Sequence, residues 1–138
     1  MVKIENSKKT ILNLAEALLQ DMGFNGFSYA HIASELGVKN AAIHYHFPTK
    51  EDLGRAVIQR YRDRFKLWVN NSRVKDLAPQ EKLDWFFSIY TAMRADQGKV
   101  CLVGSMEVEF NSIPEGLQVE VQVMHKELLA WLESMLAE

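Results

Sequence analysis

The sequence has little of the residue types that mark secreted or strand-rich proteins. It contains one cysteine in 138 residues, so no disulfide can form within the chain, and we expect a reducing cytoplasm. Only three prolines occur, and none lies between Pro48 and Pro79, which favours long helices. No run of 18 apolar residues is present, and the first residues lack the apolar block of a signal peptide. We therefore expect no association with a membrane.

The charge is distributed unevenly along the chain. The formal net charge is −2 and the apolar share is 48%, enough for a buried core. Residues 1–66 hold ten Lys and Arg against seven Asp and Glu, a balance of +3, whereas residues 67–138 hold six against eleven, a balance of −5. An N-terminal part of this kind can approach phosphates while the acidic remainder stays away from them.

Apolar residues recur at helical spacing through most of the chain. The pattern predicts helices at about 7–22, 28–36, 39–46, 49–70, 79–97, 105–110 and 114–137, with loops at 70–72 and 76–79. The fold class that follows is all-α. We expect two parts, residues 1–52 and residues 53–138, with the boundary inside the fourth helix.

Residues 28–46 have the pattern of a helix-turn-helix. Ser28 is a good N-cap, Ile32 and Leu36 lie on one face of the first helix, and Gly37 stands where the chain leaves it. Val38 and Ile43 would bury the inner side of the second helix. The residues that remain free to face a DNA groove are Lys39, Asn40, Ala42, His44 and Tyr45.

Further short motifs occur with this pattern: Gly23-Phe24, Gly37-Val38, the run from His44 to Phe47, and Thr49-Lys50-Glu51. In these residues, and over about residues 7 to 66, the chain resembles the TetR family of bacterial transcriptional repressors. The resemblance implies a three-helix DNA-binding head on a helical body that binds a small-molecule effector and forms a homodimer.

Residue chemistry suggests how such a head would contact double-stranded DNA. Asn40 can pair with adenine, Ala42 can touch a thymine methyl, and Tyr45 can pack on sugars or methyl groups. Residues 41 and 42 are both Ala, where the family often has Gly or Thr, so a hydroxyl donor is missing. Thr49 and Lys50 begin a helix, whose N-terminus attracts phosphate. The predicted DNA-binding residues are Ser28, Tyr29, Lys39, Asn40, Ala42, His44, Tyr45, His46, Thr49 and Lys50.

Some of these residues have a structural interpretation as well. The resemblance places Tyr45 and His46 at positions that meet DNA and Lys50 at a position that binds phosphate. Tyr45 and His46 could instead brace the motif helix, and Ser28 could serve only as a cap.

The second half is rich in Met and aromatic residues, a composition typical of a core or of an adaptable ligand pocket. The resemblance implies an effector pocket, and the residues predicted to line it are Phe86, Tyr90, Met93, Met106 and Phe110. Cys101 is a candidate redox or electrophile sensor, because Lys99 would favour its thiolate and some relatives have a sensing Cys in this segment. Apolar neighbours would instead leave the thiol inert.

No catalytic constellation is recognisable, and the His and Cys spacing suggests no metal site, so we expect neither an enzyme nor a cofactor. The expected function is a repressor that binds a palindromic operator as a dimer and leaves it when an effector binds. A protein-interaction module, or a truncated family member with weak DNA binding, is the alternative. By the resemblance, the C-terminal part is short, so we expect a weak dimer or an aggregation-prone monomer.

Overall fold

The computed structural model describes residues 4–137, and within them the chain forms eight α-helices, one short 3-10 helix and no strand, which confirms the predicted all-α fold. The elements are α1 (Ile4–Met22), α2 (Tyr29–Leu36), α3 (Asn40–His46), α4 (Lys50–Val69), α5 (Ser72–Lys75), α6 (Pro79–Gln97), α7 (Leu102–Val108), η1 (Phe110–Ser112) and α8 (Glu115–Leu136).

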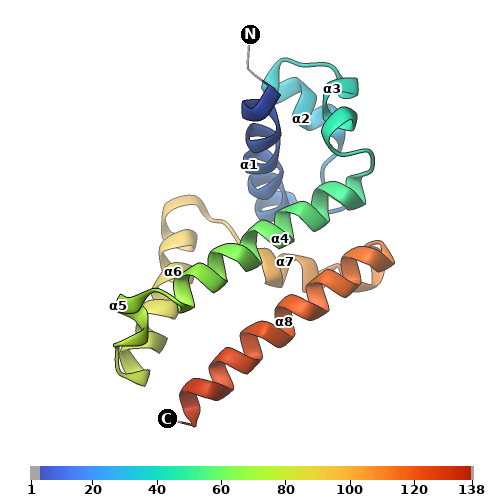
Figure 1. Ribbon diagram of the computed structural model, residues 1–138. Helices are drawn as coiled ribbons and strands as arrows, with labels where there is room; N and C mark the ends of the chain where they lie inside the picture. Colours follow the sequence, from blue (N-terminus) through green and yellow to red (C-terminus); the bar gives the residue numbers. More distant parts are fainter. Residues whose placement is uncertain (1–3, 138) are drawn as a thin grey trace.

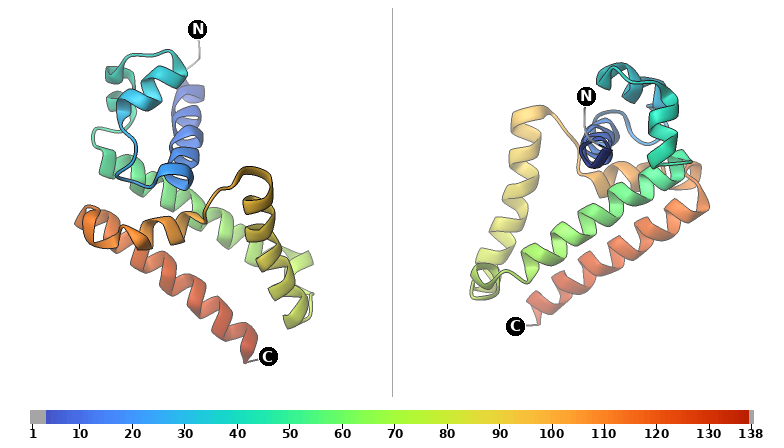
Figure 2. Two further views of the ribbon diagram at one scale, coloured as in Figure 1. Left: turned by 180° about the vertical axis from the view of Figure 1, so that it is seen from behind. Right: turned by 45° about the horizontal axis from the view of Figure 1, so that its top comes forward.

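The helices form a head and a body that share α4. Figure 1 shows α1, α2 and α3 together at one end, and α4 running from this head into the body. In the body, α8 lies along α4, and α6 packs near the C-terminal end of α4 (Figure 2). Helix α7 lies between α1 and α8. The predicted division at residues 52 and 53 therefore falls inside one continuous helix.

Two elements differ from the sequence prediction. Helix α5, Ser72–Lys75, occupies a stretch that we expected to be largely loop, because the Asn71 side chain accepts a hydrogen bond of 2.9 Å from the Arg73 amide and caps a single turn. Helix α7 begins at Leu102, three residues before the predicted start, since Leu102 and Val103 are buried and α7 packs against α1.

One apolar core runs through both parts. Ile11 and Leu19 of α1, Ile43 of α3, Leu53 of α4 and Leu117 of α8 are each at most 2% exposed and belong to the same cluster. A continuous, close-packed core transmits displacements, because its side chains have no free space to absorb them. The head is thus mechanically joined to the body.

Ion pairs hold α8 against α4. The Arg62 guanidinium binds Glu127 with two nitrogens, at 2.9 and 2.6 Å, and reaches Glu120 at 3.1 Å. The hydrogen bond from Arg62 lowers the pKa of the Glu127 carboxyl, which stays ionised at neutral pH. Arg62 is mostly buried, so this planar, bidentate pairing fixes the register of the two helices.

The connection between α1 and α2, residues 23–27 (the head loop), is held from two sides by opposite charges. The Glu109 carboxylate accepts hydrogen bonds from the amides of Phe24 at 2.6 Å and Asn25 at 3.1 Å. The Lys50 ammonium donates to the carbonyl oxygens of Phe24 and Phe27. An anion thus binds the loop's N–H groups and a cation binds its C=O groups.

Gly23 is required in this arrangement for two reasons. Its φ of +76° disfavours any residue with a side chain. A Cβ at this position would also lie 2.6 Å from Glu109 Oε2. The Glu109 carboxylate therefore rests directly on the backbone of the head.

We predict that Glu109→Gln loosens the head loop. The amide that replaces one carboxylate oxygen is a donor, so it cannot accept from a backbone N–H and one charge-assisted bond is lost. We expect a loss of about 1–2 kcal/mol in the free energy of unfolding and faster hydrogen exchange at the Phe24 and Asn25 amides.

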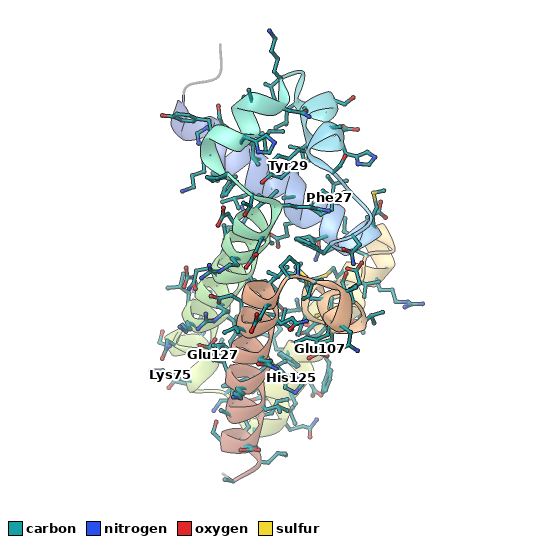
Figure 3. All side chains as sticks on the ribbon, turned by 90° about the vertical axis from the view of Figure 1, so that its right-hand side faces the viewer. Phe27, Tyr29, Lys75, Glu107, His125 and Glu127 are labelled. Carbon is teal, nitrogen blue, oxygen red and sulfur yellow. The ribbon has the colours of Figure 1, made fainter. Side chains whose placement is uncertain are left out.

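The matched control is Glu107→Gln, because Glu107 lies two residues before Glu109 and pairs with the exposed His125 instead of the head loop (Figure 3). This variant should change stability by less than about 0.5 kcal/mol. Equal exchange at Phe24 and Asn25 in both variants would contradict the role given to Glu109.

Candidate functional site

The turn between α2 and α3 follows from Gly37. Its φ of +65° and ψ of 32° are left-handed, and the Val38 amide donates back to the Ala33 carbonyl oxygen at 3.0 Å. This bond closes the end of α2 and redirects the chain. No atom lies within 4 Å of a Cβ placed on Gly37, so backbone conformation, not space, selects glycine here.

Helix α3 is anchored on one side and exposed on the other. Ile43 is fully buried, whereas Lys39, Asn40, Ala42, His44 and Tyr45 are exposed. Tyr45 is 76% exposed, a large value for an aromatic side chain. Val38, predicted to be buried with Ile43, is 42% exposed, because it lies on the rim of a cleft beside α1. The face predicted to meet DNA is thus free in this structure.

The two histidines of α3 have different surroundings. His44 Nδ1 lies 3.1 Å from the Pro48 carbonyl oxygen, which can only accept, so Nδ1 carries the proton and Nε2 is an acceptor in the neutral ring. His46 is half-buried, lies edge-on to Tyr45 at 5.1 Å and lines the cleft of about 280 Å³ between α1 and α3. For His46, bracing of α3 and contact with DNA both stay predictions.

Ser28 and Thr49 cap the helices that follow them. Thr49 Oγ1 accepts from the Asp52 amide at 3.0 Å, and the Thr49 amide donates to the Asp52 carboxylate at 3.0 Å. The Ser28 amide donates to His31 Nδ1 at 2.9 Å, so an imidazole takes the place of the usual acidic partner. Both residues are exposed, and their predicted phosphate contacts stay predictions.

The structure contradicts the predicted DNA contact of the Tyr29 side chain. The side chain is 7% exposed, and its hydroxyl lies 2.9 Å from the Phe47 carbonyl oxygen and 2.6 Å from that of Thr49. Burial, with a smaller contribution from Asp52, raises the pKa of the phenol to about 12. Tyr29 is thus a neutral donor that ties α2 to the segment after α3, and Figure 3 shows it inside the head.

The contacts of Lys50 also differ from the prediction. We predicted a phosphate contact at the start of α4, but the ammonium binds the Phe24 and Phe27 carbonyls and lies 4.6 and 4.4 Å from the centroids of their rings. Burial lowers the pKa of this ammonium, and the nearby Glu109 opposes that shift. Lys50 therefore acts within the head, since its charge is already bound by the head loop.

The predicted effector residues fall into three places. Phe86, Tyr90 and Met93 do line one cavity of about 250 Å³ between α4 and α6. Met106 is 1% exposed and belongs to the core, while Phe110 lies at a separate cleft beside α8. Neither Met106 nor Phe110 lines the cavity between α4 and α6, because α7 packs against α1 and α8.

Seven cavity residues were missing from the predicted set: Glu16, Gln20, Tyr61, Arg64, Phe65, Trp68 and Ile89. Tyr61, Phe65 and Trp68 of α4 recur at helical spacing, a pattern that is typical of a core and does not by itself indicate a ligand cavity. The signal in the sequence that points to a cavity is Tyr61, since the hydroxyl of a buried Tyr needs a hydrogen-bond partner. That partner is Tyr90, whose hydroxyl oxygen lies 3.4 Å from that of Tyr61.

Cys101 is the N-cap of α7, and its half-buried thiol interacts with the hydroxyls of Tyr61 and Tyr90 at the edge of this cavity. Burial raises the pKa of both phenols, so they are neutral at pH 7. The role of Cys101 as a sensor stays a prediction.

Residues 4–137 also bear on metal binding and on membrane insertion. No three His, Cys, Asp or Glu side chains of this part of the chain gather as metal ligands would. None of its helices combines the length and apolar character that a bilayer crossing needs.

The geometry of residues 28–46 defines a helix-turn-helix: two short helices, a left-handed glycine turn and an exposed second helix. A model of the tetR family of bacterial regulatory proteins matches residues 11–57. The chain is 39% identical to a TetR transcriptional regulator from Legionella pneumophila, with a TM-score of 0.85, over 96% of this chain and 72% of that one. The chain therefore belongs to the TetR family, as the sequence resemblance predicted.

Two further relatives agree with this assignment. A TetR-family regulator from Agrobacterium tumefaciens is 29% identical, with a TM-score of 0.90 over 98% of this chain and 72% of that one. An uncharacterised HTH-type transcriptional regulator in the lacX 3′ region of Lactococcus lactis subsp. lactis is 26% identical, and the match covers 91% of this chain and 65% of that protein. Membership of a family of regulators confirms that the chain is not an enzyme.

We predict that Tyr29→Phe destabilises the head while Tyr45→Phe does not. The first change removes a buried hydroxyl on which two carbonyl groups converge, and should cost about 1–2 kcal/mol of unfolding free energy. The second removes the same atom from a side chain that is 76% exposed and should stay within about 0.5 kcal/mol. Urea unfolding of both variants measures the difference, and equal midpoints would refute the assignment of Tyr29.

Proposed function

We propose that this chain is a transcriptional regulator that binds a palindromic operator as a dimer, acts as a repressor, and leaves DNA when a small molecule occupies the body. The observation that carries the proposal is the exposed face of α3, from Lys39 to Tyr45, on a helix anchored by the fully buried Ile43. A helix of this kind fits the major groove, with its first turn at the base edges.

Charge supports the same interpretation. Residues 36–50, which include α3, contain Lys39 and Lys50 and no Asp or Glu, so this segment does not repel phosphates. Exposed apolar side chains on α8, among them Val119 and Leu129, offer surface for a second copy. The chain spans 65% of the length of the Lactococcus protein, so the activity of a whole protein of that length is part of this proposal.

The direct test is selection of bound sites from random duplex DNA. We expect a palindrome whose half-sites are centred about 10 base pairs, or 34–36 Å, apart, because a twofold dimer presents two copies of α3. Tyr45→Ala should change the preferred bases, as this side chain projects furthest from the buried side of α3. Recovery of random sequences only would contradict sequence-specific binding.

We predict that Lys39 and Lys50 differ in their effect on DNA binding, although both are lysines near a helix start. Lys39→Gln should weaken binding to all sequences and lower the slope of log affinity against log salt by roughly one per half-site, because this exposed ammonium can reach a phosphate. Lys50→Gln should leave the slope unchanged, because the Lys50 charge is held by the head loop.

Fluorescence anisotropy on the selected duplex at four salt concentrations measures both slopes, well below the unfolding temperature of each variant. A lower slope for Lys50→Gln together with an unchanged slope for Lys39→Gln would show that Lys50 contacts phosphate. That result would contradict the role given to Lys50 in the head loop. The rival function, a protein-interaction module, predicts no steep salt dependence on DNA for any variant.

A further inference from the structure

We infer that the cavity between α4 and α6 selects a planar aromatic ligand of one or two rings that offers an oxygen acceptor and carries no positive charge. This inference rests on the proposed ligand-responsive function and adds the chemical class of the ligand.

The shape of the cavity comes from its aromatic walls. Phe65 and Trp68 of α4 face Phe86 and Tyr90 of α6, with ring centroids 6.3 Å apart for Trp68 and Phe86 and 5.0 Å apart for Phe86 and Tyr90. Rings at such spacing favour a further ring that stacks or meets them edge-on. A volume of about 250 Å³ is below that of typical drug-sized sites, so one or two fused rings fill it.

The charges around the cavity disfavour a cation. Glu16 is the acidic residue of the lining, and its carboxylate already binds both Arg60 and Arg64. The three groups together carry one net positive charge. That charge repels a bound cation and opposes the cation–π attraction that the aromatic walls would provide. A neutral or anionic ring stacks on the same walls without this repulsion.

Polar selectivity comes from two hydroxyls. The Tyr61 and Tyr90 oxygens lie 3.4 Å apart, so at most one of their two protons is used between them. Both hydroxyls also interact with the Cys101 thiol, whose sulfur is a weak acceptor for the other proton. A carbonyl, phenol or carboxylate oxygen on the ligand would accept this proton better than the sulfur does.

The test is calorimetric titration of the full chain, without DNA, with three two-ring probes of similar shape: neutral 2-naphthol, anionic 2-naphthoate and cationic N-methylquinolinium. We expect 2-naphthol or 2-naphthoate to bind with a Kd on the order of 10–100 µM and N-methylquinolinium to bind at least about 10-fold more weakly.

Variants connect the binding to these residues. Tyr90→Phe removes a hydroxyl and keeps the ring, and should weaken 2-naphthol binding about 5-fold or more. Arg64→Gln should reduce the preference for 2-naphthoate over N-methylquinolinium. Ser34→Ala, which removes an exposed hydroxyl from α2 in the head, should leave all three affinities unchanged.

Equal or tighter binding of the cation, absence of binding by all three probes below 1 mM, or an unaltered Tyr90→Phe variant would each overturn the inference. These outcomes are separate from the proposed function, because DNA binding is measured on its own. If 2-naphthol binds as expected but leaves DNA affinity unchanged, the release mechanism fails while the ligand class stands.

Discussion

The head loop, residues 23–27, is the point on which the arrangement of this molecule depends. Glu109 of the body binds its amides, and Lys50 of α4 binds its carbonyls, so the loop is fixed between two helical segments that belong to different parts of the fold. Neither contact would suffice alone. Without the Lys50 ammonium, the half-buried carbonyl groups of the loop would be left unpaired. Without the Glu109 carboxylate, the Lys50 ammonium would be a partly buried charge with a lowered pKa and no counter-charge. Together they set the angle at which α2 and α3 leave α1.

The same loop offers a physical route from the cavity to the DNA-binding face. Helix α7 touches the cavity edge through Cys101 at its start, and Glu109 follows directly after its end. Two hydrogen bonds hold α7 and the segment before it to α1. One runs from Ser105 Oγ to the Leu19 carbonyl oxygen at 2.9 Å, and the other from the Val100 amide to the Gln20 carbonyl oxygen at 3.4 Å. A ligand that favours one position of α7 would thereby favour one position of the head loop. This is a population shift, and it requires only that the ligand bind the two positions with different affinity.

The sequence predicted the helices well and their partners less well. Periodicity and caps place α1 to α4 because those signals are local: Gly37 needs its left-handed turn, and Thr49 with Asp52 forms a cap whatever the rest of the chain does. The roles of Tyr29 and Lys50 depend on contacts with residues about 20 or more positions away, which spacing alone does not reveal. Phe86, Tyr90 and Met93 share one helix face, which is a local pattern, and they line one cavity together. Met106 and Phe110 belong to other elements and do not line it. The effector role of the cavity stays a prediction.

The central claim is that the exposed side of α3 is the surface that meets DNA, while Tyr29 and Lys50 support it from within. The most direct measurement is a two-dimensional amide NMR titration of the full chain with a duplex that it has been shown to bind. The account predicts that the amides of residues 39–46 shift most, that the Phe24 and Asn25 amides shift less, and that the amides of residues 79–95 in α6 stay nearly unchanged. Shifts confined to α6 and α8, with α3 unaffected, would contradict it.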